Sequence, residues 1–176
     1  MLTANANTIT LSVDPNLPPT LTSYVLGAVN PGAPADPADV AAYINGIISL
    51  PLGGSGVVNG NNIYRSLNTF EPLQAVTAVD SLSGISTTVV EPGYYYLAAK
   101  YDGPCGGTAV WYLDNLGPAT FVIPQYAFGK DNAQYGLSGW TLFNPDDPSV
   151  PDGGSTLLMG LFGLGLVMGV RKFAIA

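Results

Sequence analysis

The most constraining feature of the chain is an uncharged run near its C-terminus, from Thr156 to Val170. As a helix this run extends about 22 Å, which crosses a hydrocarbon core of about 30 Å only with local thinning of the bilayer. Short apolar runs also form buried helices of globular domains. We expect a membrane helix, because the run is apolar on all sides and is followed by the basic pair Arg171-Lys172.

The side chains expected to face lipid are uncharged. They are Thr156, Leu157, Leu158, Leu161, Phe162, Leu164, Leu166, Val167 and Val170. Glycine is also common in membrane helices, and Gly165 and Gly169 form a small-xxx-small pair that could pack against a partner helix. Basic residues remain on the cytoplasmic side, so Arg171 and Lys172 should anchor that end in the cytoplasm and place the preceding domain outside.

A short polar motif precedes the apolar run: Val150, Pro151, Asp152, Gly153, Gly154 and Ser155. The order of motif, apolar run and basic pair resembles the PEP-CTERM class of bacterial sorting signals, in its Val-Pro-Asp variant. The resemblance implies an exported protein of a Gram-negative-type bacterium, held in the inner membrane before processing. It also implies an exosortase-type membrane transpeptidase as partner, which cuts near the motif and passes the protein to the cell surface or extracellular matrix.

The rest of the chain divides into three predicted parts. Residues 1–6 contain Ala4-Asn5-Ala6, which is typical of the end of a signal peptide, and we expect the rest of that signal upstream of Met1. Residues 7–144 are long enough to form one domain with a real core. Residues 145–149 form a polar, Pro-rich linker to the sorting signal at residues 150–176.

Composition favours an exported, turn-rich β-protein. Charged residues make up 10% of the chain, against about 25% in an average domain. The 22 glycines and 15 prolines separate short segments rich in Val, Thr and Tyr, which favour strands. The formal net charge is −7, and the chain offers no basic patch for nucleic acid. We therefore expect no nucleic-acid partner.

Regularly spaced short strands predict a mainly β domain, an antiparallel β-sandwich or jelly-roll-like fold. We expect strands at residues 8–13, 20–29, 62–67, 74–81, 85–90, 94–101, 109–113, 119–123 and 137–143. One short amphipathic helix is expected at residues 38–50, because Asp36 can cap it, Pro37 suits its first position and Pro51 ends it. Its apolar stripe of Val40, Tyr43, Ile44, Ile47 and Ile48 should face the core.

The hairpin at residues 94–115 is expected at the centre of the sheet. Alternation places Tyr95, Leu97, Ala99 and Tyr101 on one face, and Tyr94, Tyr96, Ala98 and Lys100 on the other. Lys100 marks the second face as the wetter one, and Trp111 should pack against one row of tyrosines. Residues 100–104, 110–112 and 136–144 are similar to pieces that recur in PEP-CTERM surface proteins, a resemblance that implies no activity.

Few residues could carry out catalysis, because the chain contains no histidine. This excludes histidine-dependent triads and most zinc or copper sites. Cys105 is expected to be a small residue in a Gly-rich turn, with an intermolecular bridge or a reactive site as the alternative. Glu71 and Glu91 could form a glycosidase pair, but each precedes a proline, as acidic residues that open turns often do. We expect no catalytic site and no enzyme activity.

Two kinds of ligand remain open. We expect no cofactor, but calcium could bind loop carboxylates, with solvated turn residues as the alternative; the candidates are Asp102, Asp114, Asp131, Asp146 and Asp147. Aromatic rings beside Asp or Asn can bind sugars. The candidate glycan contacts are Tyr94, Tyr96, Trp111 and Trp140, with Tyr101 and Tyr112 as further candidates, although most large aromatics lie in the core.

These observations predict a non-enzymatic protein of the cell surface or extracellular matrix. The alternative is a carbohydrate-binding module in the same place, with exopolysaccharide as its partner. A third interpretation is a surface domain that stays anchored in the membrane by an uncut tail.

Overall fold

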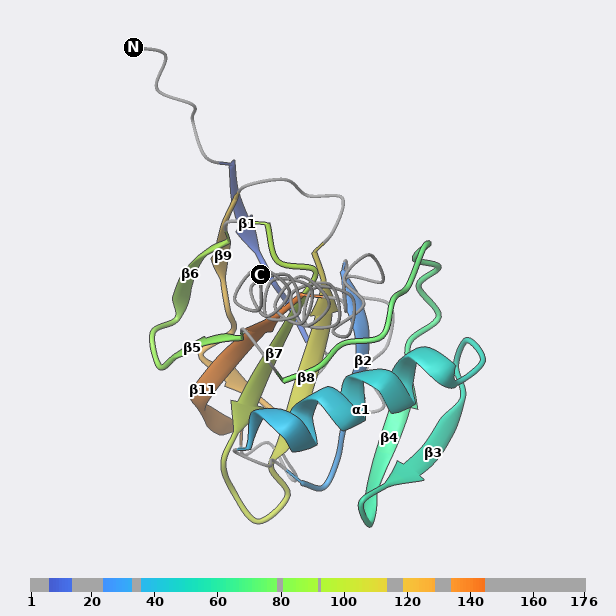
Figure 1. Cartoon of the computed structure of the whole chain (residues 1–176). Helices are drawn as coiled ribbons and strands as arrows, with labels where there is room; N and C mark the ends of the chain where they lie inside the picture. Colours follow the sequence, from blue (N-terminus) through green and yellow to red (C-terminus); the bar gives the residue numbers. More distant parts are fainter. Residues whose placement is uncertain are drawn as a thin grey trace, which may run out of the picture. The chain divides into compact units, whose positions relative to one another are not determined.

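Figure 1 shows the computed structural model of the chain. It describes residues 7–13, 24–32, 36–78, 81–91, 93–113, 119–128 and 134–144. By its internal contacts the chain divides into two units, Met1–Asp146 and Asp147–Ala176, and all described residues belong to the first. The predicted signal-peptide end, the linker and the whole sorting signal lie outside these residues. Within the described segments no helix is long and apolar enough to cross a membrane.

The described residues form mainly strands. They are β1 (Asn7–Thr10), β2 (Val25–Val29), β3 (Ser55–Val58), β4 (Asn61–Arg65), β5 (Leu82–Gly84), β6 (Thr88–Glu91), β7 (Tyr96–Tyr101), β8 (Gly107–Tyr112), β9 (Ala119–Val122), β10 (Tyr126–Ala127) and β11 (Tyr135–Phe143), with the helix α1 (Pro37–Ser49). The larger sheet has the order β10-β11-β7-β8-β2-β4-β3, with β5 also paired to β11, and the smaller has the order β1-β9-β6. The central position predicted for the β7–β8 hairpin is confirmed.

The two sheets enclose a first core, as the sandwich prediction requires. Val89 and Phe121 of the smaller sheet pack in one cluster with Tyr101 and Trp111 of the larger sheet. Two hydrogen bonds from aromatic side chains connect the layers. The Tyr101 hydroxyl donates to the carbonyl of Pro124 at 2.8 Å, and Trp111 Nε1 donates to the carbonyl of Ser12 at 3.2 Å. Strand pairs in the described residues are antiparallel except β1–β9, which is parallel and was not predicted.

A second core lies on the other face of the larger sheet, beneath α1 (Figure 1). Ile44 and Ile47 of the helix pack in one cluster with Tyr96 of β7 and Val110 of β8. Both faces of these central strands are therefore buried. The prediction that Lys100 marks a wetter face is wrong at Tyr96 and Ala98, which are buried, and holds only at the end of the strand, where Lys100 is half-buried.

The helix forms where its local signals predict. The Asp36 carboxylate accepts a hydrogen bond from the Ala38 N–H at 2.8 Å, and Pro37 occupies the first turn. The predicted apolar stripe faces the second core, with Ile44 and Ile47 fully buried. Gly27 of β2 lets the helix approach closely, since a Cβ there would lie 2.7 Å from Ile47 Cγ2.

The strand predicted at residues 74–81 is wrong for its described part, which forms only an isolated bridge at Val76. The side chain of Asn45 takes the place of a neighbouring strand: its amide donates to the Val76 carbonyl, and its oxygen accepts from the Val76 N–H, both at 2.9 Å. The Tyr96 hydroxyl similarly bonds the backbone of Gln74. Side chains therefore satisfy the backbone groups that a strand would pair.

Other strand boundaries also differ from the prediction. The strand expected at residues 85–90 begins only at Thr88, in β6, and Ser83-Gly84, expected as a turn, lies in β5. Gly136, expected as a separator, lies within β11. The short strands β3 and β10 were not predicted at all. β5 and β6 pair with the distant strands β11 and β9, which local sequence does not reveal. β3 instead pairs with β4 across the turn Asn59-Gly60, a local hairpin signal that the prediction missed.

Candidate functional site

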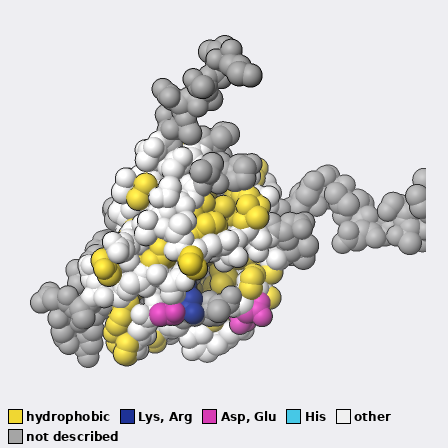
Figure 2. Space-filling model, turned by 90° about the vertical axis from the view of Figure 1, so that its left-hand side faces the viewer, with side chains coloured by type: hydrophobic (Ala, Val, Ile, Leu, Met, Phe, Trp, Pro, Cys, Tyr) yellow, Lys and Arg dark blue, Asp and Glu magenta, His cyan; other side chains and the backbone are white. Residues whose placement is uncertain are grey.

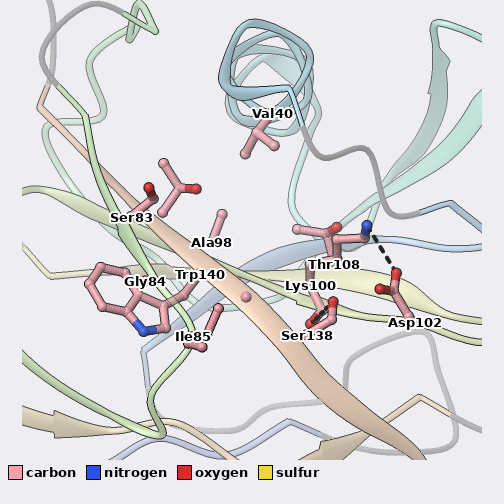
Figure 3. Close-up of a pocket in the computed structure, with 12 residues that line it drawn as sticks. Val40, Ser83, Gly84, Ile85, Ala98, Lys100, Asp102, Thr108, Ser138 and Trp140 are labelled. Carbon is pink, nitrogen blue, oxygen red and sulfur yellow. Dashed lines mark hydrogen bonds and ion pairs between the residues drawn. The ribbon is translucent and has the colours of Figure 1, made fainter.

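A pocket of about 270 Å³ lies beside α1, on the helix side of the larger sheet (Figure 3). The helix packs mainly on β2, β3 and β4, and the pocket lies over the neighbouring strands β7, β8 and β11. Its polar lining consists of Ser83, Lys100, Asp102, Thr108, Ser138 and Thr141. Val40 on α1 and Ala98 on β7 add apolar surface. The pocket is thus small and rich in hydroxyl groups.

Thr108 is the deepest polar residue of the pocket. It lies directly opposite Lys100 in the β7–β8 pair and is only 1% exposed. Among the described residues, its Oγ1 is the one buried side-chain polar atom without a hydrogen-bond partner. Buried hydroxyls are normally bonded to protein or water, and Thr108 lines the pocket, so a group bound there can supply the missing partner.

An ion pair forms the rim of the pocket. Lys100 Nζ lies 3.0 Å from Asp102 Oδ1, with side chains 26% and 57% exposed (Figure 3). Exposure therefore increases from Thr108 through Lys100 to Asp102. The inner end of the pocket therefore holds a buried hydroxyl, and its outer end holds an exposed carboxylate.

A bulge in β11 forms a further part of the pocket wall. Its register against β7 shifts between Leu137 and Gly139, and a bulge re-aims the side chains around it. The Ser138 hydroxyl lies there and donates to the carbonyl of Lys100 at 3.2 Å. The bulge thus fixes Ser138 against the strand that carries the ion pair.

Trp140 supports the pocket wall from the opposite side of the sheet. Its ring packs against the first core and beside Gly84 of β5. Its Nε1 donates to the carbonyl of Ser86 at 2.9 Å. The indole therefore holds β5 against β11.

The pocket unites two segments that the sequence analysis had singled out separately. Lys100 and Asp102 come from residues 100–104, and Ser138 to Thr141 come from residues 136–144. The register of β7 and β11 places Lys100 opposite Gly139. The sequence did not predict that these two segments lie side by side, nor that Thr108 belongs to the site. A polar residue in the otherwise apolar strand GTAVWY was a usable signal for Thr108.

Most of the residues predicted as glycan contacts are not exposed, so this prediction is wrong for them. Tyr96 and Trp111 are fully buried, as are Tyr101 and Tyr112, because both faces of their strands are covered. Tyr94 is half-buried and packs against the first core. Of the candidates, Trp140 alone contributes to the lining of the pocket.

The remaining candidates bring no second site together. Asp114, Asp131, Asp146 and Asp147 lie outside the described residues, and within those residues no group of three or more His, Cys, Asp or Glu could hold a metal ion. Cys105 is free and half-buried. Glu71 is exposed, and the Glu91 side chain lies outside the description. The calcium and catalytic-pair predictions therefore stay untested.

Two buried titratable groups lie away from the pocket. Burial lowers the pKa of Arg65, whose guanidinium donates to the carbonyls of Leu26 and Asn68, both at 3.4 Å. Burial raises the pKa of Tyr101 above its ordinary value. Charged side chains form only small patches on the face shown in Figure 2. Arg65 and Tyr101 therefore belong to the interior of the domain, and the Lys100–Asp102 ion pair supplies the charged groups of the pocket.

Comparison with known proteins identifies the C-terminal segment. A family model of the VPDSG-CTERM motif matches residues 149–172. The chain carries a VPDSG-CTERM sorting signal. This motif is a variant of the PEP-CTERM class, and Gly153 stands here at the position of its serine. No curated protein and no solved structure matches the chain.

The VPDSG-CTERM signal indicates how the protein is sorted. It indicates an exported protein that is anchored in the membrane before processing, and it implies processing by an exosortase-type membrane enzyme. The motif, the apolar run and the basic pair predicted from the sequence all fall in or next to the matched residues.

Proposed function

We propose that the protein is a non-enzymatic component of the cell surface or extracellular matrix, released there after exosortase processing. The observation that carries this proposal is the VPDSG-CTERM match at residues 149–172. A sorting signal of this kind delivers the folded domain that precedes it. The β-sandwich of residues 7–144 is then the mature, functional part.

The groups in the pocket support a non-enzymatic role. Lys100 is engaged in an ion pair with Asp102, so the Thr108 hydroxyl has no free base beside it to make it a nucleophile. The chain contains no histidine that could serve instead. The pocket is therefore better suited to binding than to proton transfer.

The experiment is the intact mass of the protein recovered from the cell-surface fraction. We expect a C-terminus near Pro151, without the mass of Arg171 and Lys172. A surface-exposed form that retains the whole tail would contradict release and would favour the anchored alternative. Recovery only from the cytoplasm would contradict export itself.

Glycan binding is a second candidate function, favoured by the pocket beside α1. Hydroxyl groups, a carboxylate and an ammonium group line one small cavity, and such groups bind the hydroxyls of sugars. Retention on a column of exopolysaccharide tests this function. Equal elution from that column and from an uncoupled column would count against it.

A further inference from the structure

We propose that the pocket beside α1 binds a single uncharged saccharide unit at the end of a glycan chain, an inference that rests on the second candidate function. The site consists of Thr108, Lys100, Asp102 and Ser138, supported by Ser83 and Thr141. It differs from an aromatic stacking platform, because the tyrosines and tryptophans expected to form one are mostly buried.

The buried hydroxyl of Thr108 is the unpaired polar group that a ligand in the pocket would satisfy. Its Oγ1 has no partner among the described residues, and its residue is 1% exposed. A hydroxyl both donates and accepts, so it can pair with a sugar hydroxyl in either direction. Water can take this place in the free protein, and the sugar would displace it.

The ion pair at the rim selects an uncharged ligand. A sugar hydroxyl can donate to the Asp102 carboxylate while a neighbouring one accepts from the Lys100 ammonium, and the 3.0 Å pair stays intact. An anionic ligand would place a like charge against Asp102, and a cationic ligand would place one against Lys100. The net charge of −7 further disfavours polyanionic chains.

The size of the pocket limits the ligand to one ring. Its volume of about 270 Å³ lies at the small end of ligand sites, which typically span about 300–1,000 Å³. Val40 and Ala98 line it as well and offer apolar contact to the C–H groups of a ring. The exposed Asp102 lies where the remainder of a glycan chain would leave the pocket.

The test is a titration of the full-length chain with methyl glycosides of glucose, galactose, mannose and N-acetylglucosamine, which mimic a chain end. The protein is kept in a detergent without a sugar headgroup, and backbone amide shifts are followed by NMR. We expect saturable shifts at Lys100, Thr108 and Ser138 with at least one glycoside. Thr108→Val should weaken binding about tenfold, the factor expected for one buried hydrogen bond.

The matched control is Thr88→Val on the exposed surface of β6, which should leave binding unchanged. Thr108→Val keeps the side-chain shape and removes a hydroxyl that has no partner, so the melting temperature should not fall. Asp102→Asn is a second variant at the exposed rim and should also weaken binding. It keeps the test decisive if Thr108→Val does not fold.

Three results would overturn the proposal. They are the absence of saturable shifts with every glycoside, equal affinity of the Thr108 and Thr88 variants, and tighter binding of methyl glucuronide than of methyl glucoside. None of them bears on the C-terminal mass of the surface protein. Failure of the sugar site is therefore distinguishable from failure of the sorting function.

Discussion

Gly84 and Trp140 lie directly opposite each other in the β5–β11 pair. A Cβ added at Gly84 would lie 2.5 Å from Cζ2 of the indole, a separation that real Cβ atoms do not adopt. The indole thus covers the backbone of β5 at this point, and its Nε1 bonds the carbonyl of Ser86 just beyond. This contact holds the wall of the pocket in place.

Gly84→Ala should therefore destabilise the protein by about 1–3 kcal/mol, the usual cost of overpacking. The added methyl group has to displace the Trp140 ring or the strand. The measurement is the free energy of unfolding in urea. Gly136→Ala is the control, because a Cβ there meets only Tyr126 Cε1 at 4.0 Å; equal effects of the two changes would refute the contact.

Asn45→Ala should loosen the segment that covers the second core. The change removes both hydrogen bonds to the backbone of Val76, and each unpaired buried group costs about 1–3 kcal/mol. Alanine favours helix, so a loss of stability cannot come from α1 itself. Faster amide exchange at Val76 is the expected result, and Asn62→Ala on an exposed side chain is the control.

Tyr101 should make the protein less stable at alkaline pH. Burial raises its pKa in the folded state, whereas an unfolded tyrosine titrates near pH 10. Its contribution is complete below about pH 10 and declines as the pH rises toward the folded-state value, because only the unfolded chain then releases the proton.

Tyr101→Phe tests this dependence. The variant should be about 1 kcal/mol less stable near neutral pH, since the carbonyl of Pro124 loses its donor. The difference from the wild type should narrow above about pH 10. Urea unfolding across the pH series provides the measurement, and Tyr126→Phe on a side chain that is 54% exposed is the control. A constant difference across the series would contradict the argument.

Replacing both Pro151 and Asp152 by alanine should abolish processing. The two residues lie in the matched sorting motif, which the exosortase-type enzyme has to recognise. Immunoblots of cell fractions should then show the unprocessed chain in the membrane and none at the surface. The control replaces Asp147 and Pro148 by alanine, which changes the same residue types just outside residues 149–172. Loss of processing in this control as well would contradict a specific role of the motif.

The sandwich and its helix could be predicted because their signals are local. Asp36, Pro37 and the apolar stripe of α1 lie within one stretch of chain, and closely spaced turns favour antiparallel strands. Large aromatic side chains usually lie in the core, but the alternation of one strand does not reveal that both faces around Tyr96 and Trp111 are covered. The hydrogen bonds that satisfy the backbone of Val76 come from the side chain of Asn45, which lies 31 residues earlier.

The sequence by itself determined that the protein carries a sorting signal for export, because such a signal is a linear motif followed by an apolar run and a basic pair. Tertiary structure alone decided where a ligand could bind. Lys100, Thr108 and Ser138 meet only because β7 pairs with β8 on one edge and with β11 on the other. Such pairing depends on burial and register across the whole sheet, and no single stretch of the chain encodes it.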